Sequence, residues 1–188
     1  RSWFGTRLSQ VRVLSPRLLI RIPLIHPSQR DLSSKTIDTM IEIRKASKVQ
    51  AAEIAHLIMM AMTDDCCLHF CGDGYGLEDF RRMMTLLVEH EGSQYSYRNT
   101  LVAVEGQKVI GIAVSYDGGQ LHELRQAFIH AAKENIGKDH SCMDDETQAG
   151  ELYLDSLAVL PEYRRQGIAQ SLDRKSVVGK ESRSRWSP

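Results

Sequence analysis

The chain has 188 residues, 42% of them apolar and 26% charged, which is the composition of an ordinary globular domain. Its length allows one domain with a substantial core and is short for two. No apolar run approaches the roughly 20 residues that span a bilayer. Residues 41–172 carry 12 basic and 20 acidic side chains, so we expect neither a membrane nor a nucleic-acid partner. The four cysteines do not suggest a disulfide scaffold, which favours the reducing cytoplasm.

The two ends of the chain differ in character from this acidic body. Residues 1–39 are rich in arginine and serine, lack a strand or helix period, and are followed at once by Met40. Their composition resembles a transit peptide, but the position of Met40 favours a non-native or disordered extension, with the domain beginning at residue 40. Residues 173–188 are basic and also lack a period, which predicts a non-native tail. A basic tail that binds an acidic partner is the alternative.

Between these ends, the hydrophobic pattern predicts an alternation of strands and helices. Residues 41–46 alternate as a strand does, and Ser47 with Gln50 forms a capping-box pattern at the start of a helix. In chain order, the expected elements are a strand over 41–46, helices over about 47–62 and 77–90 with a loop at 63–76 between them, a hairpin over 99–105 and 108–116, a helix over 120–135, a strand over 151–159 and a helix from about 166. This order predicts one mixed α/β domain.

The segment after the last strand has the features of a diphosphate-binding turn. Pro161 ends the strand, and a helix begins a few residues later, where unpaired N–H groups and the helix dipole favour an anion. Gly167 lets an anion approach the backbone because it has no Cβ, and Ala169 keeps a nearby position small. Arg164 and Arg165 add donors that suit phosphate oxygens. An ordinary helix start with solvated arginines is the alternative.

The pattern Arg164-x-x-Gly167-x-Ala169 resembles the acetyl-CoA pyrophosphate signature of the GNAT superfamily of N-acetyltransferases, Q/R-x-x-G-x-G/A. The strand and turn before it are also similar to that family, as is the order of elements from residue 41 to 172. The resemblance implies a mixed α+β three-layer fold of the acyl-CoA N-acyltransferase type, with core strands 1–4. It also implies that residues 40–172 are an incomplete domain whose C-terminal half is missing, so we expect a fragment with no useful acetyl transfer.

The resemblance further implies acetyl-CoA as a co-substrate and no metal. The backbone of Leu157 and Val159 would pair with the pantetheine arm, and a backbone N–H near Val159 would polarise the thioester carbonyl. The cofactor-binding residues that it implies are Leu157, Val159, Arg164, Arg165, Gln166, Gly167, Ile168 and Ala169.

The family's reaction is a direct attack of a primary amine on the thioester, with a base that accepts the amine's proton. Some members carry a glutamate midway along this strand, where this sequence has Tyr153. A strand period of two places Glu151 and Asp155 on the same face as Tyr153. The candidate catalytic residues are therefore Glu151, Tyr153 and Asp155, and the alternative for each carboxylate is a solvated or hydrogen-bonded side chain without a role.

In this family the loop at 63–76 would border the amine site. Its Asp64, Asp65 and Asp73 favour a cationic small-molecule or peptide amine, with a solvated acidic loop as the alternative. The cysteines of the loop lack the spacing of a zinc site, so we expect no metal there. A homodimer is compatible with this interpretation. The competing interpretation of the whole chain is a CoA-binding or interaction module without turnover.

Overall fold

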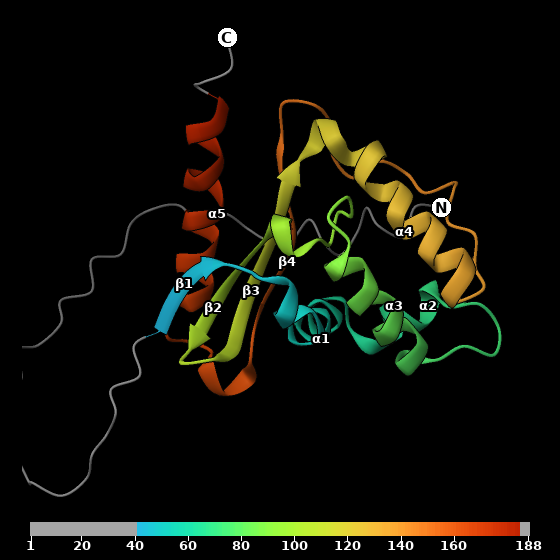
Figure 1. The fold of residues 1–188 in the computed structure, drawn as a ribbon, viewed down its shortest axis with the longest axis horizontal. Coiled ribbons are helices and arrows are strands. Elements are labelled where there is room, and N and C mark those ends of the chain that lie inside the picture. The colour runs from blue at the N-terminus through green and yellow to red at the C-terminus, as the bar shows by residue number, and fades with distance from the viewer. Residues whose placement is uncertain (1–40, 185–188) are drawn as a thin grey trace, which may run out of the picture. The chain divides into compact units, whose positions relative to one another are not determined.

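The computed structural model describes residues 41–184, which are built around one antiparallel sheet (Figure 1). Its strands follow the order of the sequence and are β1 (Ile41–Lys45), β2 (Thr100–Glu105), β3 (Lys108–Asp117) and β4 (Leu152–Val159). The α-helices are α1 (Ala51–Met62), α2 (Asp64–Phe70), α3 (Leu77–Glu89), α4 (Leu121–Asn135) and α5 (Ile168–Ser184). Short 3₁₀ turns are η1 (Lys48–Gln50), η2 (Tyr97–Asn99), η3 (Gly118–Gln120) and η4 (Pro161–Tyr163). This agrees closely with the expected order of elements.

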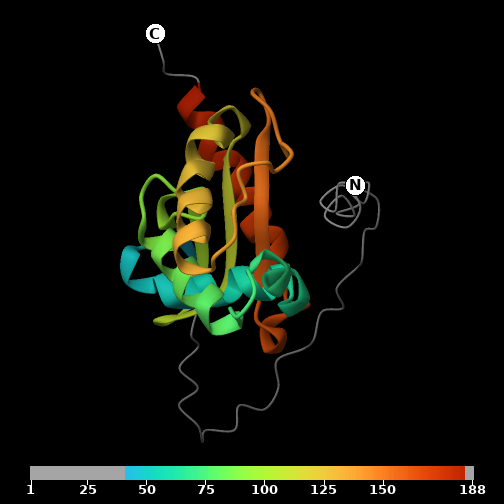
Figure 2. The same cartoon turned by 90° about the vertical axis from the view of Figure 1, so that its right-hand side faces the viewer.

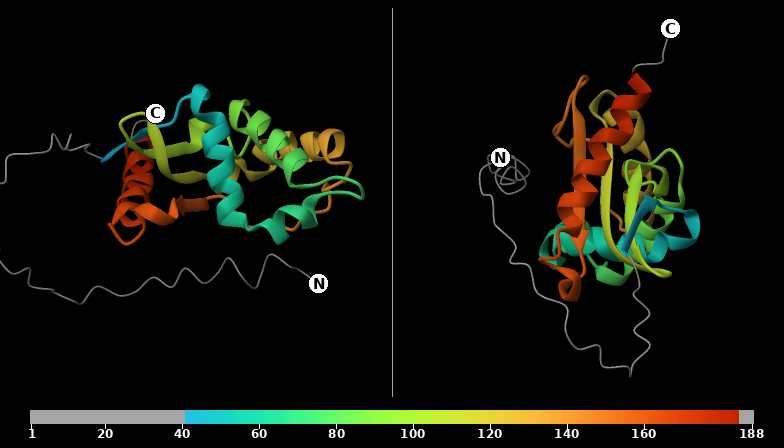
Figure 3. Two further views of the ribbon diagram at one scale, coloured as in Figure 1. Left: turned by 90° about the horizontal axis from the view of Figure 1, so that it is seen from below. Right: turned by 90° about the vertical axis from the view of Figure 1, so that its left-hand side faces the viewer.

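Helices cover both faces of the sheet. α1, α3 and α4 gather on one face (Figure 2), where the side chains of Val102, Ile112 and Val114 belong to the largest of three core clusters. α5 lies across the other face (Figure 3, right), where Ile168 and Leu172 pack against the strands. Because both faces of β3 are covered, every residue of this strand except its first and last is buried. The predicted three-layer mixed fold is confirmed.

An irregularity in the pairing of β3 with β4 sets the direction of one important side chain. Val114 pairs with Ser156 and Ser115 pairs with Leu154, which leaves Asp155 as an extra residue on β4. A β-bulge of this kind bends the strand and changes where its side chains point. The simple alternation assumed from the sequence therefore does not hold along the whole of β4.

The structure corrects two predictions about secondary structure. The expected loop at 63–76 contains α2, whose first turn carries Asp64 and Asp65 and whose Phe70 is buried in the core. Acidic residues stabilise a helix N-terminus, and the glycines that suggested a loop come only after the helix ends. The second correction concerns residues 173–184, which continue α5 although their sequence lacks a helical period. Ser176 is buried and Lys175 donates to the Ile43 carbonyl of β1, so tertiary contacts hold the first turn of this continuation. The predicted N-terminal extension over residues 1–39 lies outside the described residues.

Candidate functional site

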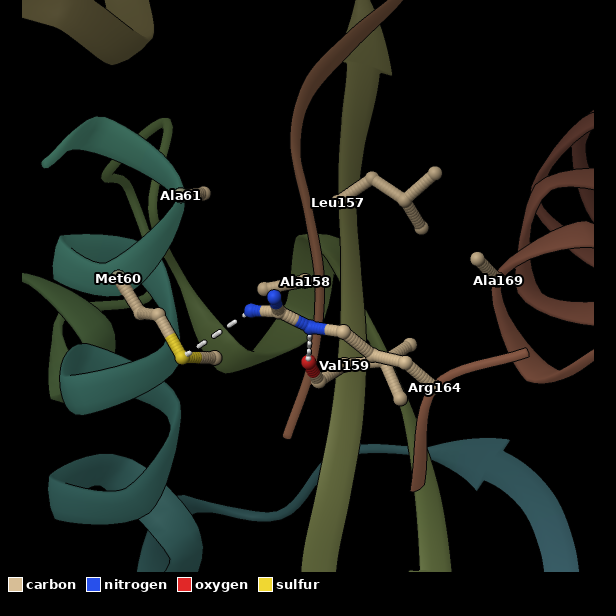
Figure 4. Close-up of a pocket in the computed structure, with 7 residues that line it drawn as sticks. All are labelled: Met60, Ala61, Leu157, Ala158, Val159, Arg164 and Ala169. Atoms are coloured by element: carbon tan, nitrogen blue, oxygen red, sulfur yellow. Dashed lines mark hydrogen bonds between the residues drawn. The ribbon is translucent and has the colours of Figure 1, made fainter. Parts of the chain in front are cut away.

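A cleft opens at the outer edge of β4, between α1 and the start of α5 (Figure 4). Its volume is about 280 Å³, and its lining residues are Met60, Ala61, Leu157, Ala158, Val159, Arg164 and Ala169. Four of them, from Leu157 to Ala169, were predicted from the sequence to bind the cofactor. α1 contributes Met60 and Ala61, which the sequence analysis did not predict. Met60 is only partly buried, and its sulfur faces the cleft.

The backbone of β4 is available on the side of the cleft. The Leu160 N–H donates to the Ile110 carbonyl at 2.9 Å, so the alternation of an antiparallel strand turns the polar groups of Val159 away from β3. Consistent with this, the Val159 carbonyl accepts a hydrogen bond of 3.0 Å from Nε of Arg164. Leu157 lies two residues earlier and shares this orientation. The backbone polar groups of Leu157 and Val159 thus point away from β3, and the Arg164 side chain lies across that of Val159.

The turn into α5 has the geometry of an anion cradle. Gly167 has a φ of +79°, a conformation that favours glycine, and a Cβ built there would meet no atom within 4 Å. α5 begins at the next residue, so its first N–H groups have no partner within the helix. Arg165 beside it also has a positive φ, +62°. Ile168 is buried, so only its backbone is available to a ligand. The open space at Gly167 fits the approach of a diphosphate to the backbone.

Asp155 is held by two donors and is partly buried. One carboxylate oxygen accepts from the Ser156 hydroxyl at 2.8 Å, and the other lies 3.4 Å from the side-chain nitrogen of Gln94. Burial raises the pKa of Asp155 to about 6, and the nearby Glu146 adds to the effect. A carboxyl group with such a pKa can exchange a proton near neutral pH.

Tyr153 packs beside this carboxylate and against a second tyrosine. Its ring meets that of Tyr116 edge to face, with centroids 5.5 Å apart. Burial raises the pKa of both phenols, and the negative charge of Asp155 raises them further. Both phenols are therefore protonated near neutral pH, and they form an aromatic wall beside Asp155.

Glu151 does not join this group. It precedes β4 and accepts hydrogen bonds from the Thr147 hydroxyl at 3.0 Å and the Gln148 backbone N–H at 3.1 Å. The Gln148 bond lowers the pKa of Glu151 more than any other contact, and the carboxylate is exposed. A lowered pKa makes it a weak base, so the structure assigns Glu151 to a loop turn. Glu151 stands just before Leu152, the first residue of β4, so the strand period on which its expected placement rests does not extend to it.

Buried polar groups near Asp155 were missed by the sequence analysis. Arg125 on α4 is 4% exposed, pairs with the Glu146 carboxylate and Asp145, and donates to the Asp144 carbonyl at 3.1 Å. Burial raises the pKa of Glu146. Among the described residues, buried side-chain atoms without a hydrogen-bond partner are Gln94 Oε1, the Tyr116 hydroxyl and Arg125 Nε. The sequence did hold a sign of the buried Arg125, because this arginine lies among the apolar residues that form the buried face of α4.

The acidic residues of the 63–76 segment have a different setting from the one expected. Asp64 and Asp65 form the exposed first turn of α2, and Asp73 is exposed in the loop that follows. Burial raises the pKa of the neighbouring Cys67 thiol to about 12. Within residues 41–184, no three His, Cys, Asp or Glu side chains are grouped so that they could hold a metal ion. No helix in the same range is both long and apolar enough to cross a bilayer.

Comparison with known proteins agrees with this geometry. Residues 74–176, more than half of the chain, match the model of the Acetyltransferase (GNAT) family. Two similar solved structures are a crystal structure of an acetyltransferase and one of an N-acetyltransferase from Staphylococcus aureus Mu50. The first has a TM-score of 0.63 and 21% identity, and the match covers 76% of each chain. The second has a TM-score of 0.60 and 21% identity, covering 74% of this chain and 76% of the other. No match was found among curated proteins.

The chain therefore belongs to the GNAT acetyltransferase family, as its sequence signature predicted. At their level of identity, the two structures establish the fold rather than a shared substrate. The expectation of a missing C-terminal half gains no support from these matches, which extend over about three quarters of the chain.

Proposed function

We propose that this chain transfers an acetyl group from acetyl-CoA to a primary amine by direct attack, with Asp155 as the base. The observation that carries the proposal is the placement of two features on one strand. Asp155, with its pKa of about 6, lies two residues before Leu157, which lines the cleft at the edge of β4. A proton acceptor and a residue that lines the cleft thus lie two positions apart on the same strand.

The cofactor would be held by the backbone and by two arginines. The N–H groups at the start of α5, from Gly167 to Ala169, would bind the diphosphate together with Arg164 and Arg165. Val159 would offer its backbone to the pantetheine arm once Arg164 releases the carbonyl that it now binds. Acetyl-CoA supplies an activated thioester, and its thiol, with an ordinary pKa of about 8.5, is a good leaving group.

Asp155 would receive the proton that the amine loses when its nitrogen bonds to the acetyl carbon and the carbon–sulfur bond breaks. Above about pH 6 the carboxylate is ionised and can take this proton. Ser156 and Gln94 hold one oxygen each, which fixes the direction of the carboxylate. In solution the acceptor amine is an ammonium ion without a lone pair, so it gives a first proton to solvent before the attack and a second proton to Asp155 as the new bond forms, while CoA leaves as the thiolate. The negative charges of Asp155 and Glu146 favour the approach of such a cation. Small-molecule and peptide amines both fit this description.

The test is release of free thiol from acetyl-CoA in the presence of a panel of primary amines, spermidine among them. We expect release with at least one amine, a loss of about 100-fold or more in Asp155→Asn, and little change in the exposed control Asp139→Asn. Acetyl-CoA binding without thiol release for any amine would favour the binding module without turnover. Full activity in Asp155→Asn would show that another group is the base.

A further inference from the structure

We propose that Gln94 is a positioning residue for the reaction, which fixes the Asp155 carboxylate through its side-chain amide. Gln94 lies on the loop between α3 and η2, 61 residues before Asp155 in the sequence. The inference rests on the proposed role of Asp155 as the base, and it adds a second residue from a separate part of the fold.

The backbone of Gln94 is firmly anchored. Its N–H donates to the Leu124 carbonyl of α4 at 3.3 Å, and its carbonyl accepts from the Asn99 side chain at 3.4 Å. Gln94 is 2% exposed, and its neighbours Ser93 and Ser96 are fully buried. A side chain that leaves such a loop has little room to move, so its contact with Asp155 is fixed by the fold and costs little additional entropy.

The amide of Gln94 can serve both protonation states of Asp155. In the structure its nitrogen lies 3.4 Å from Oδ2 of Asp155, as suits an ionised carboxylate. Its oxygen, Oε1, is buried and has no partner. An amide carries a donor and an acceptor of nearly the same size, so a half-turn of this group would bring the oxygen to a protonated Asp155. Without the half-turn, the proton of Asp155 and the amide N–H of Gln94 would be two donors facing each other, which favours the half-turn once the proton arrives.

Charged and titratable groups face Asp155 from every neighbouring element. They are Glu146 from the loop before β4, Arg125 from α4, Tyr95 from the loop after α3, Tyr116 from β3 and Tyr153 from β4. Arg125 is paired with Glu146 and so contributes little free positive charge. The donors that favour the ionised form of Asp155 are therefore the Ser156 hydroxyl and the Gln94 amide, which both lower its pKa against the effect of burial.

The direct test is titration of the Asp155 carboxyl carbon by NMR in aspartate-labelled protein, with the signal assigned by its absence in Asp155→Asn. Gln94→Met keeps the length of the side chain and removes its donor, and Gln94→Glu keeps its shape and adds a charge. We expect the titration midpoint to rise by about one pH unit in Gln94→Met and further in Gln94→Glu, because a second carboxylate opposes ionisation. Gln126→Met, an exposed glutamine on α4, is the matched control and should leave the midpoint in place.

A midpoint that stays at the wild-type value in both Gln94 variants would overturn the proposal. If Gln94 had only a structural role, its substitution would lower the melting temperature, but the titration midpoint of Asp155 would not rise from the wild type to Gln94→Met and again to Gln94→Glu. The acidic limb of the kcat/KM profile, measured with an amine that the wild type accepts, should move in parallel with the midpoint. If the titration midpoint shifts but the acidic limb of kcat/KM does not, the contact between Gln94 and Asp155 is confirmed and Asp155 is not the base. Failure of the proposed function can therefore be told apart from failure of the contact.

Discussion

Replacement of Asp155 by asparagine should stabilise the fold above pH 6, although it removes the proposed base. Burial raises the pKa of Asp155 from its ordinary value of 3.8 to about 6. The folded state therefore binds a proton more tightly than the unfolded state does. The stability that this proton gives is complete below about pH 4 and is lost as the pH rises towards 6. Two pH units correspond to about 3 kcal/mol, which is the free energy that ionisation of Asp155 costs the folded state at pH 7.5.

The asparagine variant avoids this cost because its side chain is neutral at every pH. Its amide meets the Ser156 and Gln94 donors less well than a carboxylate does, so the net gain at pH 7.5 should be between about 1 and 3 kcal/mol. Urea unfolding of both proteins at pH 4 and pH 7.5 measures the difference. We expect the stability difference to grow in favour of the variant as the pH rises. A difference that is constant with pH, or one that favours the wild type more at pH 7.5, would refute the argument from burial.

Two further predictions concern residues that pack against the segment between α4 and β4. Arg125→Met should destabilise the fold by about 3 kcal/mol in urea unfolding at pH 7.5, because it leaves the Glu146 carboxylate buried without its partner. The control is Arg81→Met, which removes an exposed ion pair with Glu78. Equal stability of the two variants would contradict the burial of the Arg125–Glu146 pair. Gly118→Ala should lower stability by about 1–3 kcal/mol, because its Cβ would lie 2.2 Å from the Gln148 carbonyl oxygen. An unchanged melting temperature in Gly118→Ala would show that the turn before β4 is not packed as described.

The elements of the fold were predictable where the local pattern is strong. The hairpin of β2 and β3, the helix α4 and the start of α5 all follow from periodicity and turn residues that lie close together in the sequence. α2 was missed because its seven residues are too few to show a helical period, and the glycines that follow it indicate a loop. The continuation of α5 beyond Leu172 was missed because its contacts at Lys175 and Ser176 are tertiary, and no local pattern reports them.

The residues of the candidate site were likewise predictable only where they lie close together in the sequence. The cofactor residues from Leu157 to Ala169 form one continuous motif, and four of them line the cleft. Gln94 and Arg125 come from distant segments and meet Asp155 or its neighbours only in the folded chain. The bulge at Asp155 depends on register with β3 and had no signal in the sequence of β4 alone.

The measurement that most directly tests the central claim is calorimetric titration of acetyl-CoA into the wild type, Gly167→Val and Gly106→Val. Both glycines have a positive φ, +79° and +61°, and neither has an atom within 4 Å of an added Cβ. The two substitutions therefore strain the backbone alike, but only Gly167 lies at the start of α5, whereas Gly106 lies in the β2–β3 hairpin. We predict that Gly106→Val binds acetyl-CoA as the wild type does, and that Gly167→Val binds it at least about tenfold more weakly, a loss of about 1.4 kcal/mol. Equal affinities in the two variants would contradict the assignment of this turn to the cofactor.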